Sequence, residues 1–179
     1  QREVSRISIE GGTDDQRVAF YTALYHAMID PRAFADVDGS YPGGDGKPHK
    51  TRKYVRRTVF SGWDVYRSAY PLMTLIAPSV VTDMINSLSD LAVESKKDYL
   101  ERWEFLNAYS GCMNGNPAVT VIADAYKKGL CDFDVDQAYD LAKKTCERFG
   151  NRKFGYMPMR ISDTLEQGLN EWCVAELAS

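Results

Sequence analysis

The chain has 179 residues, of which 44% are hydrophobic and 26% are charged, and its formal net charge is −3. This composition is typical of one soluble globular domain, and the acidic balance excludes a general attraction to nucleic acid or to an anionic membrane. No apolar run reaches the roughly 18 residues that a membrane-spanning helix needs, so no membrane span is expected. The four cysteines form no C-x-x-C pair and have no closely spaced His partner, which predicts buried free thiols rather than a metal site.

The first predicted helix begins at a cap formed by Thr13 or Asp14 and ends before Asp30-Pro31. Its apolar residues recur at steps of three and four, as on one face of a helix. Residues 31–57 then contain seven glycines and prolines, a composition that predicts a long loop. Aromatic residues within this loop favour a functional role over disorder.

Two helices are predicted next, over residues 64–76 with a kink at Pro71, and from Pro78 to about Lys96. The following stretch, RWEFLNAYSGCMNGNPAV over residues 102–119, obeys neither the helical nor the strand period. We interpret it as a loop at a functional site.

Three helices complete the chain. Asn116 is expected to cap the first of them and Pro117 to be its first residue, and the second covers DVDQAYDLAKKTCERFG. The third covers DTLEQGLNEWCVAELA, where Asp163 and Glu166 have the spacing of a capping box. About six helices and almost no strand signals predict an all-α fold, and the pattern does not distinguish a bundle from a helical toroid.

Two loop segments carry charges that suit ligand binding. DVDGSYPGGDGKPH begins like a calcium loop, but no acid stands at the twelfth position, so a polar turn near a polyol or metal site, involving Asp45 and His49, is the better interpretation. The run from Lys47 to Arg57 has six cations, which form either a solvated face or a site for an anion such as phosphate. Nucleic acid is a poor third choice, since one basic loop lacks a wider positive surface.

Two further segments place carboxylates beside aromatic or apolar surface. In FSGWDVYRSAYP, Trp63 offers a ring on which a sugar can stack and Asp64 a carboxylate for its hydroxyls, while an Asp64–Arg67 pair on a helix surface is the structural alternative. On the last helix, Glu166 shares a face with Asn170 and Cys173. A carboxylate on this helix is either a general base or a surface residue.

Seven segments in the same order resemble the glycoside hydrolase family 92 exo-α-mannosidases. They are FYTALYHAMIDPRAFADVDGSYPGGDGKPH, TVFSGWDVYRSAYPLMTLIAP, DMINSL, GCMNGNPAVTVIADAYKKG, DFDVDQAY, GYMP and TLEQGLNEWCVAELA. The resemblance implies an N-terminal β-sandwich domain followed by an (α/α)6 toroid, and the inverting, Ca²⁺-dependent removal of terminal α-linked mannose from glycans. Residues 1–179 then form part of the toroid with about half of its helices, so we expect the rest of the polypeptide to be its partner, as the cut-looking ends suggest. A secreted or periplasmic parent is implied as well.

The resemblance also assigns residues. Glu171 is the leading base candidate, with Glu166 behind it, because the family has an Asp-Asp pair where this chain has Asn170 and Glu171. Asn107 and Ser110 are the expected metal ligands. The residues expected at the substrate are Trp63, Asp64, Arg67, Glu104, Asn107, Tyr109, Asp45 and His49.

This sequence departs from the family pattern at two places. Residues 50–62, where the general acid is expected, contain no Asp or Glu. The polar Asn-Glu-Thr triplet of many members is replaced by Ala108-Tyr109-Ser110. Either the acid comes from another segment, such as Asp45 or a residue outside residues 1–179, or the leaving group is a phosphate, as in relatives that uncap mannose-1-phospho-6-mannose. A carbohydrate-binding relative without catalysis and a helical protein-interaction domain are the remaining hypotheses.

Overall fold

The computed structural model describes residues 4–150 and 153–179. Its helices are the 3-10 helix η1 (Val4–Arg6) and α1 (Asp14–Ala27), α2 (Gly62–Val65), α3 (Ala69–Ile76), α4 (Pro78–Glu94), α5 (Pro117–Lys127), α6 (Val135–Phe149) and α7 (Ile161–Leu177). Its strands are β1 (Arg32–Ala33), β2 (Ser40–Pro42), β3 (Pro48–Lys50), β4 (Arg57–Thr58), β5 (Phe60–Ser61), β6 (Trp103–Phe105) and β7 (Ala108–Tyr109).

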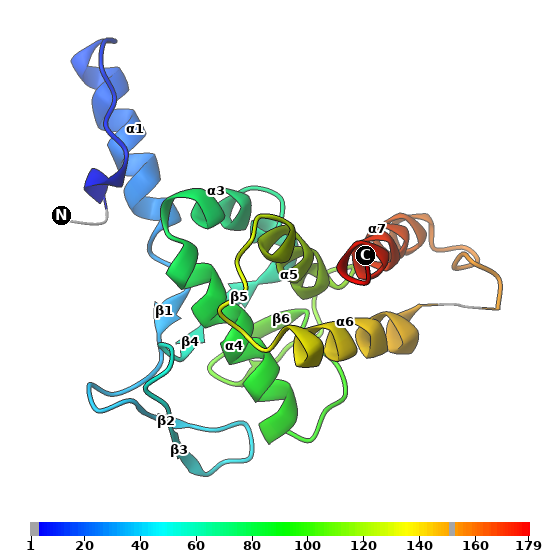
Figure 1. The fold of residues 1–179 in the computed structure, drawn as a ribbon. Coiled ribbons are helices and arrows are strands. Elements are labelled where there is room, and N and C mark those ends of the chain that lie inside the picture. Colours follow the sequence, from blue (N-terminus) through cyan, green and yellow to red (C-terminus); the bar gives the residue numbers. More distant parts are fainter. Residues whose placement is uncertain (1–3, 151–152) are drawn as a thin grey trace.

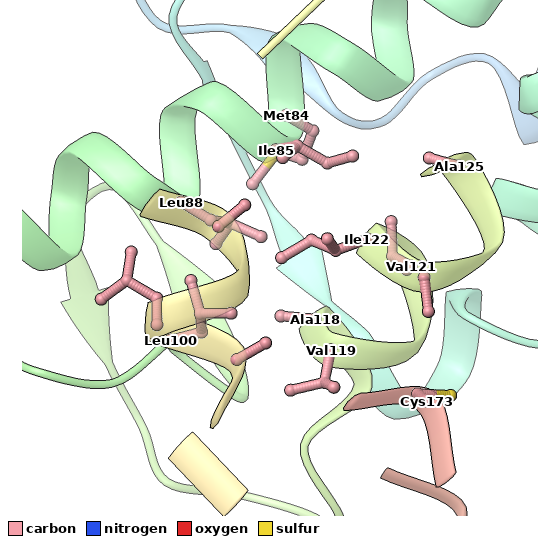
Figure 2. Close-up of a cluster of buried hydrophobic side chains, with 14 of the residues drawn as sticks. Met84, Ile85, Leu88, Leu100, Ala118, Val119, Val121, Ile122, Ala125 and Cys173 are labelled. Atoms are coloured by element: carbon pink, nitrogen blue, oxygen red, sulfur yellow. The ribbon is translucent and has the colours of Figure 1, made fainter. Parts of the chain in front are cut away.

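The hydrophobic core lies where α3 to α7 pack together, with α4 running through the middle of the molecule (Figure 1). Figure 2 shows Leu88 of α4 and Ile122 of α5 pointing toward one another, with Cys173 of α7 at the edge of the cluster. Each of these side chains is at most 2% exposed. Burying a Leu or Ile side chain stabilises the folded state by about 1.5–3 kcal/mol, so this cluster holds α7 in place.

The predicted helices are confirmed where an apolar stripe and a terminal signal agree. Thr13 caps α1, and it forms a capping box with Gln16. Pro117 is the first residue of α5 and Asp134 caps α6 on the Gln137 N–H. The segment with Pro71 differs from expectation, because the chain breaks fully between α2 and α3 and Pro71 lies in the first turn of α3.

The expectation of a chain almost without strands is wrong. In the described part of the chain, seven strands of two or three residues form three small antiparallel sheets, β1–β4, β2–β3 and β5–β6–β7. Strands this short leave no readable alternation of apolar and polar residues. The three-stranded sheet joins the start of α2 to residues 103–109, and so it positions the candidate site.

Two smaller predictions are corrected in part. Asp163 and Glu166 do not form a capping box, because α7 begins at Ile161 and Asp163 pairs instead with Arg160. Of the four thiols, Cys146 and Cys173 are buried as predicted, whereas Cys112 and Cys131 are exposed. Among residues 4–150 and 153–179, no helix has the length and apolar character needed to cross a membrane.

Candidate functional site

The candidate site lies where α2, the segment 110–116 and the first half of α7 meet. Gly62 permits this approach, because a Cβ there would lie 2.3 Å from Pro117 Cγ and 2.6 Å from the Arg102 carbonyl oxygen. Any larger residue would push α2 away from α5. The side chains that α2 presents therefore depend on this glycine.

Trp63, Tyr66, Arg67 and Glu166 form a cluster that we call the aromatic cradle. The Trp63 Nε1–H donates to Glu166 Oε1 at 2.9 Å, and the Tyr66 hydroxyl lies 3.4 Å from Oε2. Arg67 Nη2 lies 4.0 Å from Glu166 Oε1. Burial and the neighbouring Glu166 carboxylate raise the pKa of Tyr66, so its hydroxyl remains a donor. Three of the predicted site residues thus meet across more than 90 positions of sequence.

The Arg67 guanidinium lies over the Trp63 ring, 4.3 Å from its centroid, and 4.8 Å from that of Tyr66. Such a cation–π contact contributes about 0.5–1 kcal/mol when exposed to solvent. The Asp64–Arg67 pair, which was the structural alternative for this segment, does not form: the Asp64 carboxylate accepts from the Ser61 hydroxyl and its side chain is exposed. One face of Trp63 is therefore covered, and Asp64 lies exposed next to the cradle with Ser61 as its partner.

The segment 110–116 is shaped by its backbone. Gly111, Met113 and Gly115 have left-handed φ angles of 67°, 66° and 68°. At Gly115 an added Cβ would lie 2.9 Å from Glu166 Oε2, so the loop approaches the cradle as closely as a backbone can. Arg102 Nη1 donates to the Met113 carbonyl oxygen at 2.7 Å and holds the turn from the other side.

A buried polar network ties this loop to α7. The Asn116 N–H donates to Asn170 Oδ1 at 2.7 Å, and its side-chain amide donates to Gln167 Oε1 at 3.1 Å. Asn116 thus begins α5 as predicted, but its side chain makes no cap and binds α7 instead. Asn170 also donates to Thr120 Oγ1 at 3.1 Å, so both ends of its amide are used.

Glu171 lies on the neighbouring, exposed face of α7. The Gln167 side-chain amide donates to its Oε1 at 3.3 Å and to the Cys146 carbonyl oxygen at 3.2 Å. Glu171 also borders a small hollow lined by residues of the 155–157 turn and of α7. The sequence did not indicate the role of Gln167. The one pattern that could have done so is its i,i+3 spacing from Asn170, which places the two side chains on the same face of α7.

Asp45 and His49 meet in the β2–β3 hairpin. His49 Nε2 lies 2.9 Å from Asp45 Oδ1, and the imidazole stacks on Tyr41 with 5.8 Å between ring centroids. Hydrogen bonds from the Lys47 backbone N–H and then from His49 lower the pKa of Asp45. A general acid needs the opposite shift, so Asp45 in this setting is suited to accepting hydrogen bonds.

Glu104 and Asn107 hold the turn between β6 and β7. Glu104 is 2% exposed and accepts from the Thr58 hydroxyl and from the Val59 and Asn107 N–H groups. Burial raises the pKa of Glu104. Asn107 receives a hydrogen bond from buried Arg56 at 3.2 Å and donates to the Pro42 carbonyl oxygen at 2.7 Å.

The two expected calcium ligands do not form a cation site as they are placed here. Asn107 Oδ1 already faces the Arg56 guanidinium, and Ser110 Oγ is exposed and accepts from the Cys112 N–H at 3.3 Å. Within the described parts of the chain, no three His, Cys, Asp or Glu side chains converge as metal ligands would. Calcium needs six to eight oxygens, so these residues alone do not fit it.

Tyr109 belongs to a separate group of rings and cations. Lys97 Nζ lies 5.5 Å from its ring centroid and 5.7 Å from that of Tyr99, and Arg148 covers Tyr99 at 4.5 Å. Burial raises the pKa of Tyr109. Lys97 also pairs with buried Glu101.

Of the six cations in the basic run, three have carboxylate partners: Lys50 with Asp38, Arg56 with Glu94, and Arg57 with Asp83. Arg52 and Lys53 line a groove of about 630 Å³ together with loop residues 35–39. Half of the predicted positive charge is therefore neutralised locally.

Comparison with known proteins gives one family. The profile of the glycosyl hydrolase family 92 catalytic domain matches residues 1–179. A family GH92 α-mannosidase from Bacteroides thetaiotaomicron superposes with a TM-score of 0.90 at 30% identity, over 99% of this chain and 25% of that chain. The complex of that enzyme with mannoimidazole superposes with a TM-score of 0.89 at 31% identity, over 99% of this chain and 25% of that chain. A family GH92 inverting mannosidase from B. thetaiotaomicron VPI-5482 superposes with a TM-score of 0.88 at 28% identity, over 99% of this chain and 26% of that chain.

No curated protein sequence matches the chain. The chain spans about a quarter of the length of the solved structures that it resembles.

Proposed function

Because this chain belongs to the glycosyl hydrolase family 92 catalytic domains, we propose that it is part of an α-mannosidase that removes terminal α-linked mannose from glycans. The aromatic cradle is the observation that carries the proposal. Sugars are held by stacking on an aromatic face while nearby carboxylates accept from their hydroxyls, and Trp63 with Asp64 offers both groups. The mannoimidazole complex of the similar B. thetaiotaomicron enzyme supports a sugar of this class.

The mechanism that we propose is inverting. One carboxyl group protonates the leaving oxygen while another, about 6.5–9.5 Å away, activates a water on the far side of the sugar. Glu171 is our candidate for the base, because it is exposed and its Oε1 is oriented by Gln167. The acid has no candidate in residues 50–62, and the lowered pKa of Asp45 counts against that residue.

We keep calcium dependence as part of the proposal. Since Asn107 and Ser110 do not fit a calcium ion where they lie, the ligands would come largely from the rest of the polypeptide. Treatment of the full-length protein with a chelator should abolish hydrolysis, and added Ca²⁺ should restore it. Hydrolysis that continues after exhaustive chelation would remove calcium from the mechanism.

The deciding experiment is an assay of the full-length protein on α-1,2-, α-1,3- and phospho-linked mannosides, with the anomer of the first-formed product followed by NMR. We expect β-mannose as the initial product. If the protein hydrolyses the mannosides but the first product is α-mannose, the proposed inversion is wrong and the mannosidase activity still holds. Lack of hydrolysis together with measurable binding of mannose would support the non-catalytic, carbohydrate-binding alternative.

One observation favours a phosphate leaving group as a second candidate. Arg52 and Lys53 line the 630 Å³ groove, although Asp36, Asp38 and Asp83 line it as well. No carboxyl group lies in residues 50–62 to protonate a leaving oxygen. A phosphate departs without such a proton, and its charge suits these cations. Rapid hydrolysis of the phospho-linked substrate, with slow hydrolysis of the neutral ones, would select this candidate.

A further inference from the structure

The contacts of Glu166 suit a residue that orients other side chains better than a general acid or base. Both of its carboxylate oxygens are occupied: Oε1 accepts from Trp63 Nε1 at 2.9 Å and Oε2 faces the Tyr66 hydroxyl at 3.4 Å. Its side chain is 18% exposed, and the Gly115 backbone closes over it from the loop. A general base needs a lone pair directed at an accessible water, whereas here both oxygens face donors from Trp63 and Tyr66 and the side chain is largely covered.

The consequence of these contacts falls on Trp63. An indole has only one hydrogen-bond donor, so a single acceptor at Nε1 fixes the rotation of the ring. Glu166 also lies 4.0 Å from Arg67, which covers one face of that ring at 4.3 Å. The same carboxylate thus sets the tilt of the indole and the position of the guanidinium on it.

We propose that Glu166 is a positioning residue that orients Trp63 and anchors Arg67 on one indole face, so that the sugar stacks on the opposite face. The proposal rests on the proposed function, since it assigns Glu166 a role at the same sugar site. It predicts that the acceptor oxygen of Glu166 matters and that its ability to carry a proton does not.

The test compares Glu166→Gln, Glu166→Ala, Trp63→Phe and the double variant Trp63→Phe/Glu166→Ala in the full-length protein. Glutamine retains an oxygen that can accept from the indole, but it cannot transfer a proton. We expect Glu166→Ala to raise KM about tenfold, and Glu166→Gln to recover most of that loss with an unchanged shape of the pH profile, since general acid–base catalysis is worth about 10²–10⁴ and would be lost in both. Thermal melts of each variant identify any that fail to fold.

The double variant tests whether Glu166 acts through Trp63. Coupled residues are non-additive, so adding Glu166→Ala to Trp63→Phe should cost less than about threefold. Full additivity would overturn the proposal. A loss of kcat in Glu166→Gln as large as in Glu166→Ala, with one limb of the pH profile gone, would overturn it as well and make Glu166 catalytic.

A second readout does not depend on hydrolysis. In protein labelled with 5-fluorotryptophan, the Trp63 fluorine resonance is assigned by its absence in Trp63→Phe. We expect Glu166→Ala to shift this resonance and Glu166→Gln to shift it less. An unmoved resonance in Glu166→Ala would overturn the positioning role even if the wild type hydrolyses mannosides. If the resonance shifts in Glu166→Ala but the wild type hydrolyses no mannoside, only the proposed function is overturned.

Discussion

Gly115 is the residue on which the setting of Glu166 depends most directly. Its φ of 68° is left-handed, and an added Cβ would lie 2.9 Å from Glu166 Oε2 and 3.1 Å from Glu166 Cβ. Gly111 has nearly the same φ, 67°, but an added Cβ there has no neighbour closer than 3.8 Å. The two glycines therefore separate backbone strain from crowding.

We predict that Gly115→Ala lowers the stability and the kcat/KM of the full-length protein more than Gly111→Ala does. Both changes carry the left-handed penalty of about 1–2 kcal/mol, and only the first displaces Glu166. Thermal melts and steady-state kinetics of the two variants measure the difference. Equal losses would show that the loop does not press on the cradle.

Glu104 gives a pH-dependent prediction at the same scale. Burial raises its pKa above the ordinary value of 4.5, although hydrogen bonds from Asn107, Thr58 and Val59 oppose the shift. Ionisation therefore costs the folded state more than the unfolded state. This group's contribution to stability is fully present below pH 4.5 and falls as the pH rises through the raised folded-state pKa.

We expect Glu104→Gln to flatten this part of the pH dependence. The same variant should lose about 1–3 kcal/mol at pH 7, because its amide group would face backbone N–H donors that need an acceptor. Chemical denaturation at several pH values between 4 and 7 measures both effects. A wild type whose stability rises steadily over that range, with the same slope in the variant, would contradict the assignment.

At the scale of elements, α7 organises the candidate site. Glu166 contacts α2, Gln167 and Asn170 bind the start of α5, and Glu171 lies on the exposed side. Asn170 is 1% exposed and uses its amide as donor and acceptor together.

We predict that Asn170→Ala loosens the loop from α7. It leaves the buried Asn116 N–H without its acceptor, which costs about 1–3 kcal/mol. Asn114→Ala is the matched control, because Asn114 lies on the same loop and its side chain makes one exposed hydrogen bond of 3.3 Å, to Ser162 of α7. Hydrogen exchange of the 110–116 amides should increase in the first variant only, and similar exchange in both would argue against the network.

How far the elements follow from the sequence depends on how local their signals are. The capping of α1 and the Asn116-Pro117 start of α5 were predictable because cap residues and periodicity lie within a few positions of each other. The capping box of Asp163 and Glu166 had equally good spacing and was wrong. Glu166 is drawn instead to Trp63, 103 residues away, and no local pattern reports such a partner.

Only part of the candidate site could therefore be predicted from the sequence. Trp63 and Arg67 stood out by residue type, and the structure brings them together with Glu166. The unpatterned segment 102–119 was interpreted as a loop, but it contains β6, β7 and the start of α5. Left-handed backbone angles at Leu106, Asn107, Gly111, Met113 and Gly115 account for its lack of a periodic pattern. Gln167 was missed, and Arg56 was expected only as one cation of the basic run, because buried polar contacts leave no spacing that distinguishes such residues from surface residues.

At the scale of the whole molecule, α1 projects away from the body, and its side chains are poorly covered (Figure 1). Val18 is 66% and Tyr25 57% exposed, and on α7 Leu165 is 70% and Trp172 59% exposed. Exposed apolar surface of this kind marks an interface or promotes aggregation. The solved structures that the chain resembles are about four times its length, so they have material that can cover such surfaces.

We predict that the 179-residue chain expressed alone binds an apolar dye and self-associates more than the full-length protein does. Leu165→Ser and Trp172→Ser together should reduce dye binding, whereas Thr22→Ser on α1 should not change it. Dye fluorescence and light scattering at equal molar concentration are the measurements. A monodisperse, dye-free chain would show that these surfaces need no cover.

The separation of 103 positions between Trp63 and Glu166 also bears on the order of folding. Helices α3 to α6 follow one another along the chain and can begin to pack while α7 is still being synthesised, but the cradle requires the last helix. Closing so long a loop costs entropy that only the finished core offsets, so contacts of this separation form late. A nascent chain that ends before residue 161 would thus have much of its hydrophobic cluster and no aromatic cradle, which ties the appearance of the candidate site to the completion of the fold.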